Sequence, residues 1–234
     1  MKIEETKKKI KNLLDKGVIL KNKLRSTDRH PEKIHPSIIG DCIRKVYYGM
    51  TGETQEFTPT VLRIFDNGHY SHERMSDYFR QAGVLIAEEL HLENDEYDIT
   101  CHVDAIIEID GKRVCVDFKT CKDYPYKLLK SGKKGLSKTY VYQMNTYLWL
   151  LELDVGYFIY ENKNTQELFI IECKKEEGII KDVKERISLL RACVKNKVLP
   201  PKEYDINSDW QCKYCSYKDK CYCMKEKREV LDKL

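Results

Sequence analysis

The sequence predicts an α/β fold in which helices flank a central mixed β-sheet. Apolar residues alternate with polar ones in several short segments, as in strands, and recur three or four positions apart in longer segments, as in helices. The predicted strands are 84–92, 97–109, 155–161 and 167–174. The predicted amphipathic helices are 59–81, 137–152 and 176–197. Helices and strands interspersed in this way pack as one sheet with helices on its faces.

The chain of 234 residues is long enough to form one domain, and no stretch rich in Pro, Gly or Ser divides it. We therefore expect a single domain over 1–234. A lysine-rich helix over 4–24 comes first, and Pro200 and Pro201 end the last long helix. No apolar run reaches membrane-spanning length, so no membrane association is expected. The net charge of +4 is too small to indicate a nucleic-acid partner by itself.

The most informative segment is predicted to form a β-hairpin. Asp110 and Gly111 lie between two apolar runs, and this dipeptide favours a two-residue type I′ turn because both residues tolerate positive φ. Counting outward from the turn places Asp104 opposite Asp117, and opposed residues have Cβ atoms about 5 Å apart. Lys119 lies two residues beyond Asp117 and therefore points to the same face. The hairpin brings two carboxylates and a lysine together.

Two opposed carboxylates repel each other unless a cation lies between them or one of them is protonated. Carboxylate oxygens are suitable ligands for Mg²⁺ and Mn²⁺. A lysine beside such an ion can orient a water or stabilise charge on a phosphoryl group. The hairpin therefore predicts a metal-dependent phosphodiesterase site. The alternative is an ordinary cross-strand ion pair between Asp104 and Lys119 on a solvated face.

Two of the predicted helices carry a polar side chain on the apolar side. In helix 59–81, His72 continues an apolar stripe that includes Phe65 and Met75, so it faces inward. In helix 137–152, Gln143 lies on the same side as Tyr147, and a buried glutamine needs hydrogen-bond partners. Each residue has a simpler alternative, which is a hydrogen-bonded core histidine for the first and a backbone-capping glutamine for the second.

Four segments resemble, in order and spacing, the motifs of the RecB-like branch of the PD-(D/E)XK nucleases: Gly68–His72, Cys101–Asp104, Asp117–Lys119 and Gln143–Tyr147. That branch has G-x-x-x-H, G-h-x-D, (D/E)-x-K and Q-x-x-x-Y at these places. No single segment is specific, but the ordered set is. The resemblance covers about 37–221 and implies a restriction-endonuclease-like core. One departure is Cys101, which stands where the family has glycine and predicts tighter packing there.

The resemblance also implies roles for the matching residues. The metal ligands it implies, for Mg²⁺ or Mn²⁺, are His72, Asp104, Asp117 and the carbonyl of Phe118. Lys119 would assist the attacking water, while Gln143 and Tyr147 would support the site or the DNA strand. The activity implied is metal-dependent DNA hydrolysis, chiefly by an exonuclease on single-stranded ends. A helicase or an integrase is a further partner consistent with this family.

Ten cysteines without a signal peptide indicate thiols kept reduced, as in the cytoplasm, where they serve as metal ligands or core residues. The cysteines in apolar contexts, which we expect in the core, are Cys101, Cys115, Cys173 and Cys193. Three others, Cys212, Cys215 and Cys221, lie close together in a polar segment and need a fourth ligand. Cys223 would complete a local zinc site with them.

Cys42 is the other candidate for the fourth ligand. The segment around it resembles an iron-sulfur subfamily of the same nucleases, which includes the AddB nuclease domain and small CRISPR-associated adaptation nucleases. In that subfamily one cysteine before the core and three after it hold a 4Fe-4S cluster. We favour Cys42 over Cys223. The single domain then consists of a cluster-ligand segment (37–58), the nuclease core (59–200) and a C-terminal cysteine segment (201–234). We expect the cysteine segment to fold back on the N-terminal part. A cluster of this kind closes a long loop and acts as a structural staple.

Basic and aromatic residues alternate directly after the hairpin. Lys122, Lys133 and Lys134 are candidate phosphate contacts, and Tyr124 and Tyr126 are candidate stacking partners for exposed bases. Glycines in this stretch predict a loop that stays flexible until DNA orders it. The alternative is a solvated loop without a binding role.

Two other functions are compatible with the same residues. The first is a non-catalytic DNA-end-binding module that carries a structural zinc or iron-sulfur site. The second is a nuclease that trims DNA for a CRISPR integrase, with the same chemistry and a different partner. The intact Asp104, Asp117 and Lys119 favour a catalytic function over binding alone.

Overall fold

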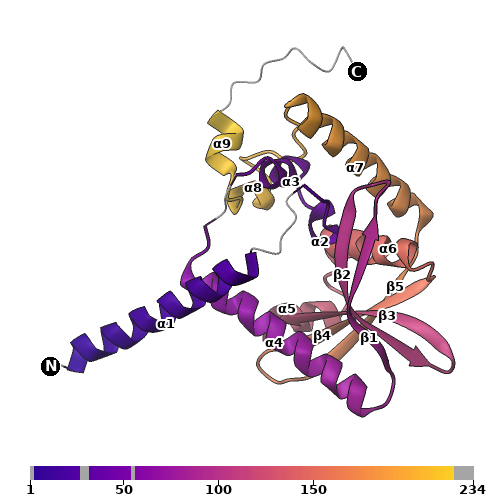
Figure 1. The fold of residues 1–234 in the computed structure, drawn as a ribbon, viewed down its shortest axis with the longest axis horizontal. Helices are drawn as coiled ribbons and strands as arrows, with labels where there is room; N and C mark the ends of the chain where they lie inside the picture. Colours follow the sequence, from indigo (N-terminus) through magenta and orange to yellow (C-terminus); the bar gives the residue numbers. More distant parts are fainter. Residues whose placement is uncertain (1–2, 27–31, 54–55, 224–234) are drawn as a thin grey trace.

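The computed structural model describes residues 3–26, 32–53 and 56–223 and confirms the α/β prediction. One mixed sheet has the strand order β1-β2-β3-β4-β5, and helices flank it (Figure 1). The strands are β1 Leu85–Asn94, β2 Ile99–Ile109, β3 Lys112–Cys121, β4 Val155–Asn162 and β5 Leu168–Lys174. The helices are α1 Ile3–Ser26, α2 Pro36–Ile39, α3 Ile43–Met50, α4 Pro59–Gln81, α5 Asp123–Lys130, α6 Lys138–Leu150, α7 Glu177–Asn196, α8 Trp210–Lys213 and α9 Lys218–Cys223.

The direction of the strands follows from how the chain connects them. β1, β2 and β3 are neighbours in sequence and pair in antiparallel fashion, as do β4 and β5. β3 and β4 pair in parallel, and α5 and α6 form the crossover between them. Parallel neighbours need such a crossover because a short turn cannot reverse the chain twice. The sheet is therefore mixed, with its one parallel pair next to the hairpin.

Apolar side chains on the two faces of the sheet enter different core clusters. Met75 of α4 packs with Phe118 on one face, and Met144 of α6 packs with Phe158 on the other. A third cluster joins α2, α3 and α7, in which Tyr48 and Leu190 are almost fully buried. Helices thus cover both faces, and the N-terminal segment is held against α7.

Local chemistry accounts for the predicted elements. Asp110 and Gly111 have φ of 52° and 73°, as a type I′ turn requires, and the hairpin register is the predicted one. Thr58 caps the N-terminus of α4, and Ser137 caps that of α6, each by accepting a hydrogen bond from a backbone N–H. These caps explain why both helices begin within a residue of the predicted position.

Two sequence-based expectations are wrong in detail. The segment after β3 is not a flexible loop throughout, because α5 forms there and buries Tyr126, which is 1% exposed. Phe65 is 43% exposed and does not belong to the buried side of α4, where Leu62 and Met75 are buried instead. The N-terminal half of α4 lies beside α1, while the sheet contacts its C-terminal half.

Arg186 of α7 ties the N-terminal segment to the C-terminal one. Its guanidinium donates to the carbonyls of Ile39 (3.0 Å) and Asp41 (2.6 Å) and forms an ion pair with Glu203. Glu203 also accepts a hydrogen bond from the backbone N–H of Ile43, at the start of α3 (2.6 Å). The C-terminal segment therefore folds back on the N-terminal part, as predicted.

The four cysteines expected in the core are buried: Cys101, Cys115, Cys173 and Cys193. In the described part of the chain, no helix has both the length and the apolar character needed to cross a lipid bilayer.

Replacing Gly40 with alanine should destabilise the protein by about 1–3 kcal/mol, because overpacking costs energy of this order. A Cβ at Gly40 would lie 2.5 Å from the Cα of Thr139, which is backbone and cannot rotate away. Urea unfolding measures the change. Gly17→Ala is the matched control, because a Cβ at Gly17 meets nothing within 4 Å and alanine favours a helix. Equal stability of the two variants would contradict this prediction.

Candidate metal centre

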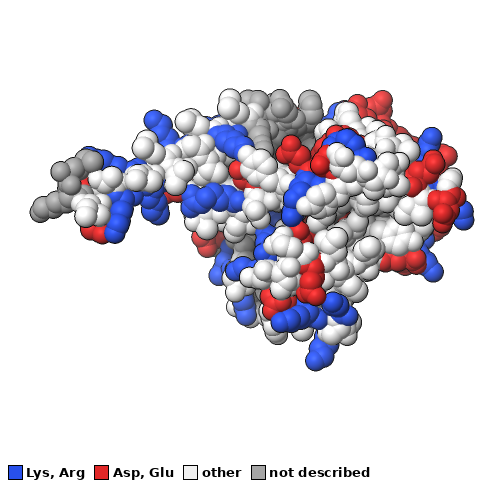
Figure 2. All heavy atoms as spheres, turned by 90° about the horizontal axis from the view of Figure 1, so that it is seen from below, with Lys and Arg blue, Asp and Glu red and all other residues white. Residues whose placement is uncertain are grey.

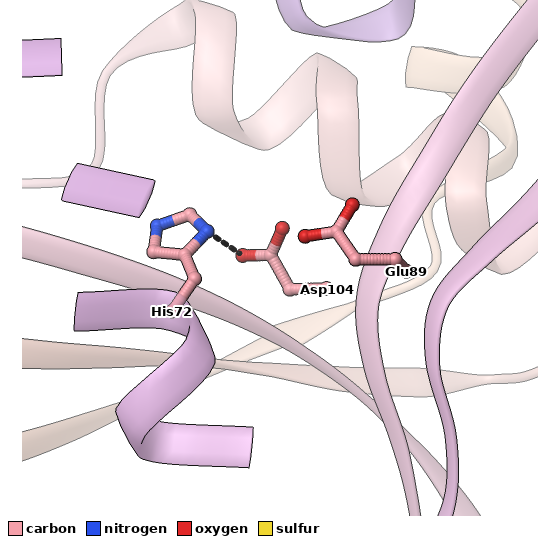
Figure 3. Close-up of side chains that lie close together, drawn as sticks. All are labelled: His72, Glu89 and Asp104. Atoms are coloured by element: carbon pink, nitrogen blue, oxygen red, sulfur yellow. Dashed lines mark ion pairs between the residues drawn. The ribbon is translucent and has the colours of Figure 1, made fainter. Parts of the chain in front are cut away.

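β1 is irregular at Glu89, beside the predicted site. Glu89 has a φ of 45°, in the left-handed region that a non-glycine residue rarely adopts. Exposure alternates along β1 except here, where Glu88 and Glu89 are both exposed. Strained residues of this kind persist where the surrounding structure fixes them, and they cluster at functional sites. The Glu89 carboxylate approaches that of Asp104 on β2 (Figure 3).

The pairing of β2 with β3 ends beside the same site. Pairing between the two strands runs from the turn to Ala105 opposite Val116 and ends there, whereas β2 stays paired with β1 as far as Ile99. Beyond this point the Asp104 carboxylate accepts a hydrogen bond from the Phe118 N–H (2.7 Å). The predicted register is confirmed up to Ala105, but the predicted direct opposition of Asp104 and Asp117 is replaced by this side-chain contact.

His72 reaches Asp104 from α4. Its Nδ1 lies 3.4 Å from Oδ2 of Asp104, and its ring contacts the Phe118 ring at a centroid distance of 5.7 Å. Burial alone would lower the pKa of His72, but the Asp104 carboxylate outweighs burial and raises it. Figure 3 shows Asp104 between His72 and Glu89, and ligand atoms of the three residues all lie within 4.8 Å of one another. His72 is therefore half-buried and faces the site.

Asp117 lies fully buried beside this group. Its exposure is 0%, and burial, with the nearby Asp104 charge, raises its pKa to about 7. Lys119 forms an ion pair with it; apart from this pair, neither carboxylate oxygen has a hydrogen-bond partner among the described residues. Burial would lower the pKa of Lys119, but the two aspartates raise it, so the amine stays charged. A buried carboxylate with such unused acceptor capacity is suited to a cation.

Gln143 and Tyr147 of α6 support the site from the face of the sheet opposite α4, on which Asp117 and Lys119 also lie. Gln143 donates from Nε2 to the Tyr147 hydroxyl (2.8 Å), and that hydroxyl donates to the carbonyl of His102 (3.1 Å). Gln143 caps no backbone group in these contacts. Tyr147 is 3% exposed, so its position favours support of β2 over contact with a DNA strand.

The residues fit a divalent metal centre. His72, Glu89 and Asp104 offer one imidazole nitrogen and two carboxylates, and the buried Asp117 offers a third carboxylate. Oxygen-rich donor sets with one imidazole suit Mg²⁺ and Mn²⁺. Glu89 was not identified from the sequence. The Glu88-Glu89 doublet, which interrupts the alternation of β1, was the signal available.

The candidate DNA-contacting lysines are on the surface. Lys122, Lys133 and Lys134 are exposed around α5 and the segment after it. Tyr124 is 72% exposed, but the burial of Tyr126 rules out base stacking by that ring in this structure. Figure 2 shows a further concentration of basic side chains along the projecting α1, whereas basic and acidic groups are mixed over the rest of that face.

The four favoured cluster cysteines line one cavity of about 150 Å³: Cys42, Cys212, Cys215 and Cys221. Arg44 and Tyr48 line the same cavity, and an Arg44 nitrogen lies 3.7 Å from the Cys221 sulfur. Burial, with Cys221 nearby, raises the pKa of Tyr48 to about 12. Among the described residues, no three of these sulfurs lie within 4.8 Å of one another. The side chain of Cys223 lies outside the described residues.

The separation of these sulfurs can be compared with that around a zinc ion. Thiolates around one zinc ion lie roughly 3.8 Å apart, given Zn–S bonds of about 2.3 Å in a tetrahedron. The sulfurs here are too far apart for that arrangement but surround a common cavity. Four thiols around one space are a donor set that a 4Fe-4S cluster can use.

Comparisons with known proteins agree with this geometry. A family model described as the PD-(D/E)XK nuclease superfamily matches residues 25–222. The crystal structure of SSO0001 shares 19% identity, covers 93% of this chain and 98% of its own, and gives a TM-score of 0.59. LHK-Exo, an alkaline exonuclease from Laribacter hongkongensis, shares 13% identity over 70% of this chain and 89% of its own, with a TM-score of 0.52. No curated protein sequence matches.

Metal affinity should depend on pH because Asp117 must lose its proton before it can bind an ion. With its pKa raised to about 7, the metal-free protein holds this proton below pH 7 and loses it above. His72, whose pKa is also raised, must lose a proton as well before it can bind the ion. The Mn²⁺ affinity should therefore rise by at least about tenfold per pH unit below about pH 7 and then level off. Titration calorimetry between pH 5.5 and 8.5 measures this. Asp117→Asn should make the rise less steep and leave the part that is due to His72. A pH-independent affinity of the unmodified protein would contradict the assignment.

Proposed function

Because the chain belongs to the PD-(D/E)XK nuclease superfamily, we propose that it is a divalent-metal-dependent deoxyribonuclease. One observation carries this proposal. His72, Asp104, Asp117 and Lys119 come from three separate elements and converge where β2 leaves β3. A protein that only binds DNA has no need of a buried, destabilised carboxylate beside a charged lysine.

We assign the metal ligands from these positions. His72, Asp104, Asp117 and the carbonyl of Phe118 would hold the ion, and Glu89 adds a carboxylate at the open side of the group. A bound Mg²⁺ or Mn²⁺ would supply the positive charge that activates water and stabilises the phosphoryl group. Asp104 is fixed by the Phe118 N–H, so its carboxylate is oriented before the ion binds.

Lys119 is the residue we assign to the attacking water. Its ammonium is held by Asp117 and lies over the Tyr140 ring, 4.7 Å from the centroid. The raised pKa keeps this group charged at neutral pH, so it can donate to water or to a phosphate oxygen that gains charge. Gln143 acts indirectly, because it holds Tyr147, which in turn holds β2.

Within this function we favour an exonuclease that acts on single-stranded DNA ends. The exposed Lys122, Lys133 and Lys134 supply positive charge beside the catalytic strand. LHK-Exo is an exonuclease of the same fold, and it supports this choice by its fold alone. A helicase or an integrase is the kind of partner that would supply free ends.

We further propose that Cys42, Cys212, Cys215 and Cys221 hold a 4Fe-4S cluster and that the chain is a member of the iron-sulfur subfamily of the RecB-like branch. The shared cavity supports this, because Cys42 lines it together with the three C-terminal cysteines. The cluster would join the two ends of one nuclease domain, and reduced thiols fit a cytoplasmic location.

A non-catalytic DNA-end-binding module is the second candidate function. The four-thiol cavity favours it in one respect, because such a centre could be structural without any cleavage site. Binding of DNA without cleavage in Mg²⁺, Mn²⁺ or other divalent ions would decide for it.

Asp117→Ala should lower cleavage of a 5′- or 3′-labelled single-stranded oligonucleotide by at least a thousandfold, because it removes the buried ligand that orients Lys119. Glu89→Gln should reduce cleavage about tenfold and raise the Mn²⁺ concentration needed for half-maximal rate. Glu88→Gln is the matched control, because Glu88 is adjacent, exposed and paired with Arg80 outside the site. Full activity of Asp117→Ala in either ion would overturn the proposed mechanism.

Cys42→Ser should abolish cluster binding, while Cys223→Ser should leave it intact. Anaerobic purification, visible absorption and iron and zinc analysis of both variants measure this, with about four irons expected per unmodified chain. A colourless protein with one zinc that depends on Cys223 but not on Cys42 would refute the cluster assignment.

A further inference from the structure

Two exposed imidazole rings stack across β1 and β2. His91 and His102 are directly opposed in the ladder, and their rings lie 4.8 Å apart between centroids at an interplanar angle of 21°. Both side chains belong to the solvent-facing side of the β1–β2 ribbon. Neither residue belongs to the metal centre described above.

This pair lies directly beside the metal centre. Exposure alternates regularly from Glu89 to His91 and from Asp104 back to His102, so all four side chains project from the same face of the ribbon. Two strand residues span roughly 6.6 Å, which places each histidine one step along the ribbon from a candidate metal ligand. A nucleic-acid strand crossing the metal centre along this face would meet the pair next.

Hydrogen bonds fix the pair in place and leave one ring available. His91 Nε2 is bound to the hydroxyl of Thr100 (3.0 Å), which is 3% exposed. The His102 carbonyl accepts a hydrogen bond from Tyr147. In the segments that the structure describes, neither ring nitrogen of His102 has a hydrogen-bond partner. His91 therefore positions His102, and the His102 ring N–H can bind a ligand without first breaking a contact.

We propose that His102, positioned by His91, forms a subsite for the DNA phosphate adjacent to the one that is cleaved. The stack covers one face of each ring and leaves the nitrogen edge of His102 open, which suits a hydrogen bond to a phosphate oxygen more than stacking on a base. This inference rests on the proposed nuclease function and extends it to a substrate contact outside the metal centre.

The test compares oligonucleotides that differ in a single phosphate. The phosphate on one or the other side of the first cleaved bond is replaced by a neutral methylphosphonate, and kcat and KM are measured in Mn²⁺. For the unmodified protein, one of these replacements should raise KM about tenfold, because a hydrogen bond to a charged group is lost. His102→Ala should raise KM for the natural oligonucleotide by a similar factor, with kcat little changed, and should be insensitive to that same replacement.

Further variants separate contact from folding. His102→Gln retains a hydrogen-bond donor, so its KM should lie between those of the unmodified protein and His102→Ala. His91→Phe keeps the stacked ring but loses the hydrogen bond to Thr100, so it should raise KM less than His102→Ala does. The matched control is Glu108→Gln with Arg113→Gln, an exposed, directly opposed pair near the hairpin turn, with Glu108 on the same strand as His102 and Arg113 on β3. If the effect of His102→Ala on KM adds to the effect of each methylphosphonate, this inference is overturned and the proposed function stands. No cleavage by the unmodified protein would overturn the proposed function and this inference with it.

Discussion

The hydrogen bond from the Phe118 N–H to the Asp104 carboxylate is the contact on which the candidate site depends. β2 must stay paired with β1 and yet separate from β3 to make room for ligands, and this separation would leave backbone groups of β3 without partners. Buried N–H groups are seldom left unpaired, so a side chain has to replace the missing strand. Asp104 does so, and the same contact fixes its carboxylate between His72 and Glu89.

The parts of this arrangement that local rules determine could be predicted from the sequence. Turn chemistry fixed the hairpin register, and helical spacing placed Gln143 and Tyr147 on one face, where they form a hydrogen bond. Glu89 could not be predicted, because a left-handed residue within a strand depends on the neighbouring strand rather than on its own preference. The helix α5 was obscured by its lysines, although Tyr126 and Leu129 carried the spacing of a buried face.

The cysteine cavity is held by contacts that do not involve sulfur. Arg186 is a buried cation that is satisfied by two backbone carbonyls and by Glu203, and Glu203 in turn binds the first N–H of α3. A buried charge with complete partners specifies one arrangement of the segments around it, and loss of one partner is costly. These contacts position Cys42 at the start of α3 beside the C-terminal segment, independently of any bound group.

The distance along the chain between the two walls of this cavity affects the order of events during synthesis. Arg44 and the Cys221 sulfur are in contact although they are separated by 177 positions. A ribosome adds about 5–20 residues per second, so Cys42 is exposed for on the order of ten seconds before the three C-terminal cysteines of the proposed cluster leave the ribosome. The sheet and its metal ligands are complete in the nascent chain by then. Assembly of the proposed cysteine centre would therefore follow formation of the sheet, and its efficiency would depend on protecting one early thiol from oxidation.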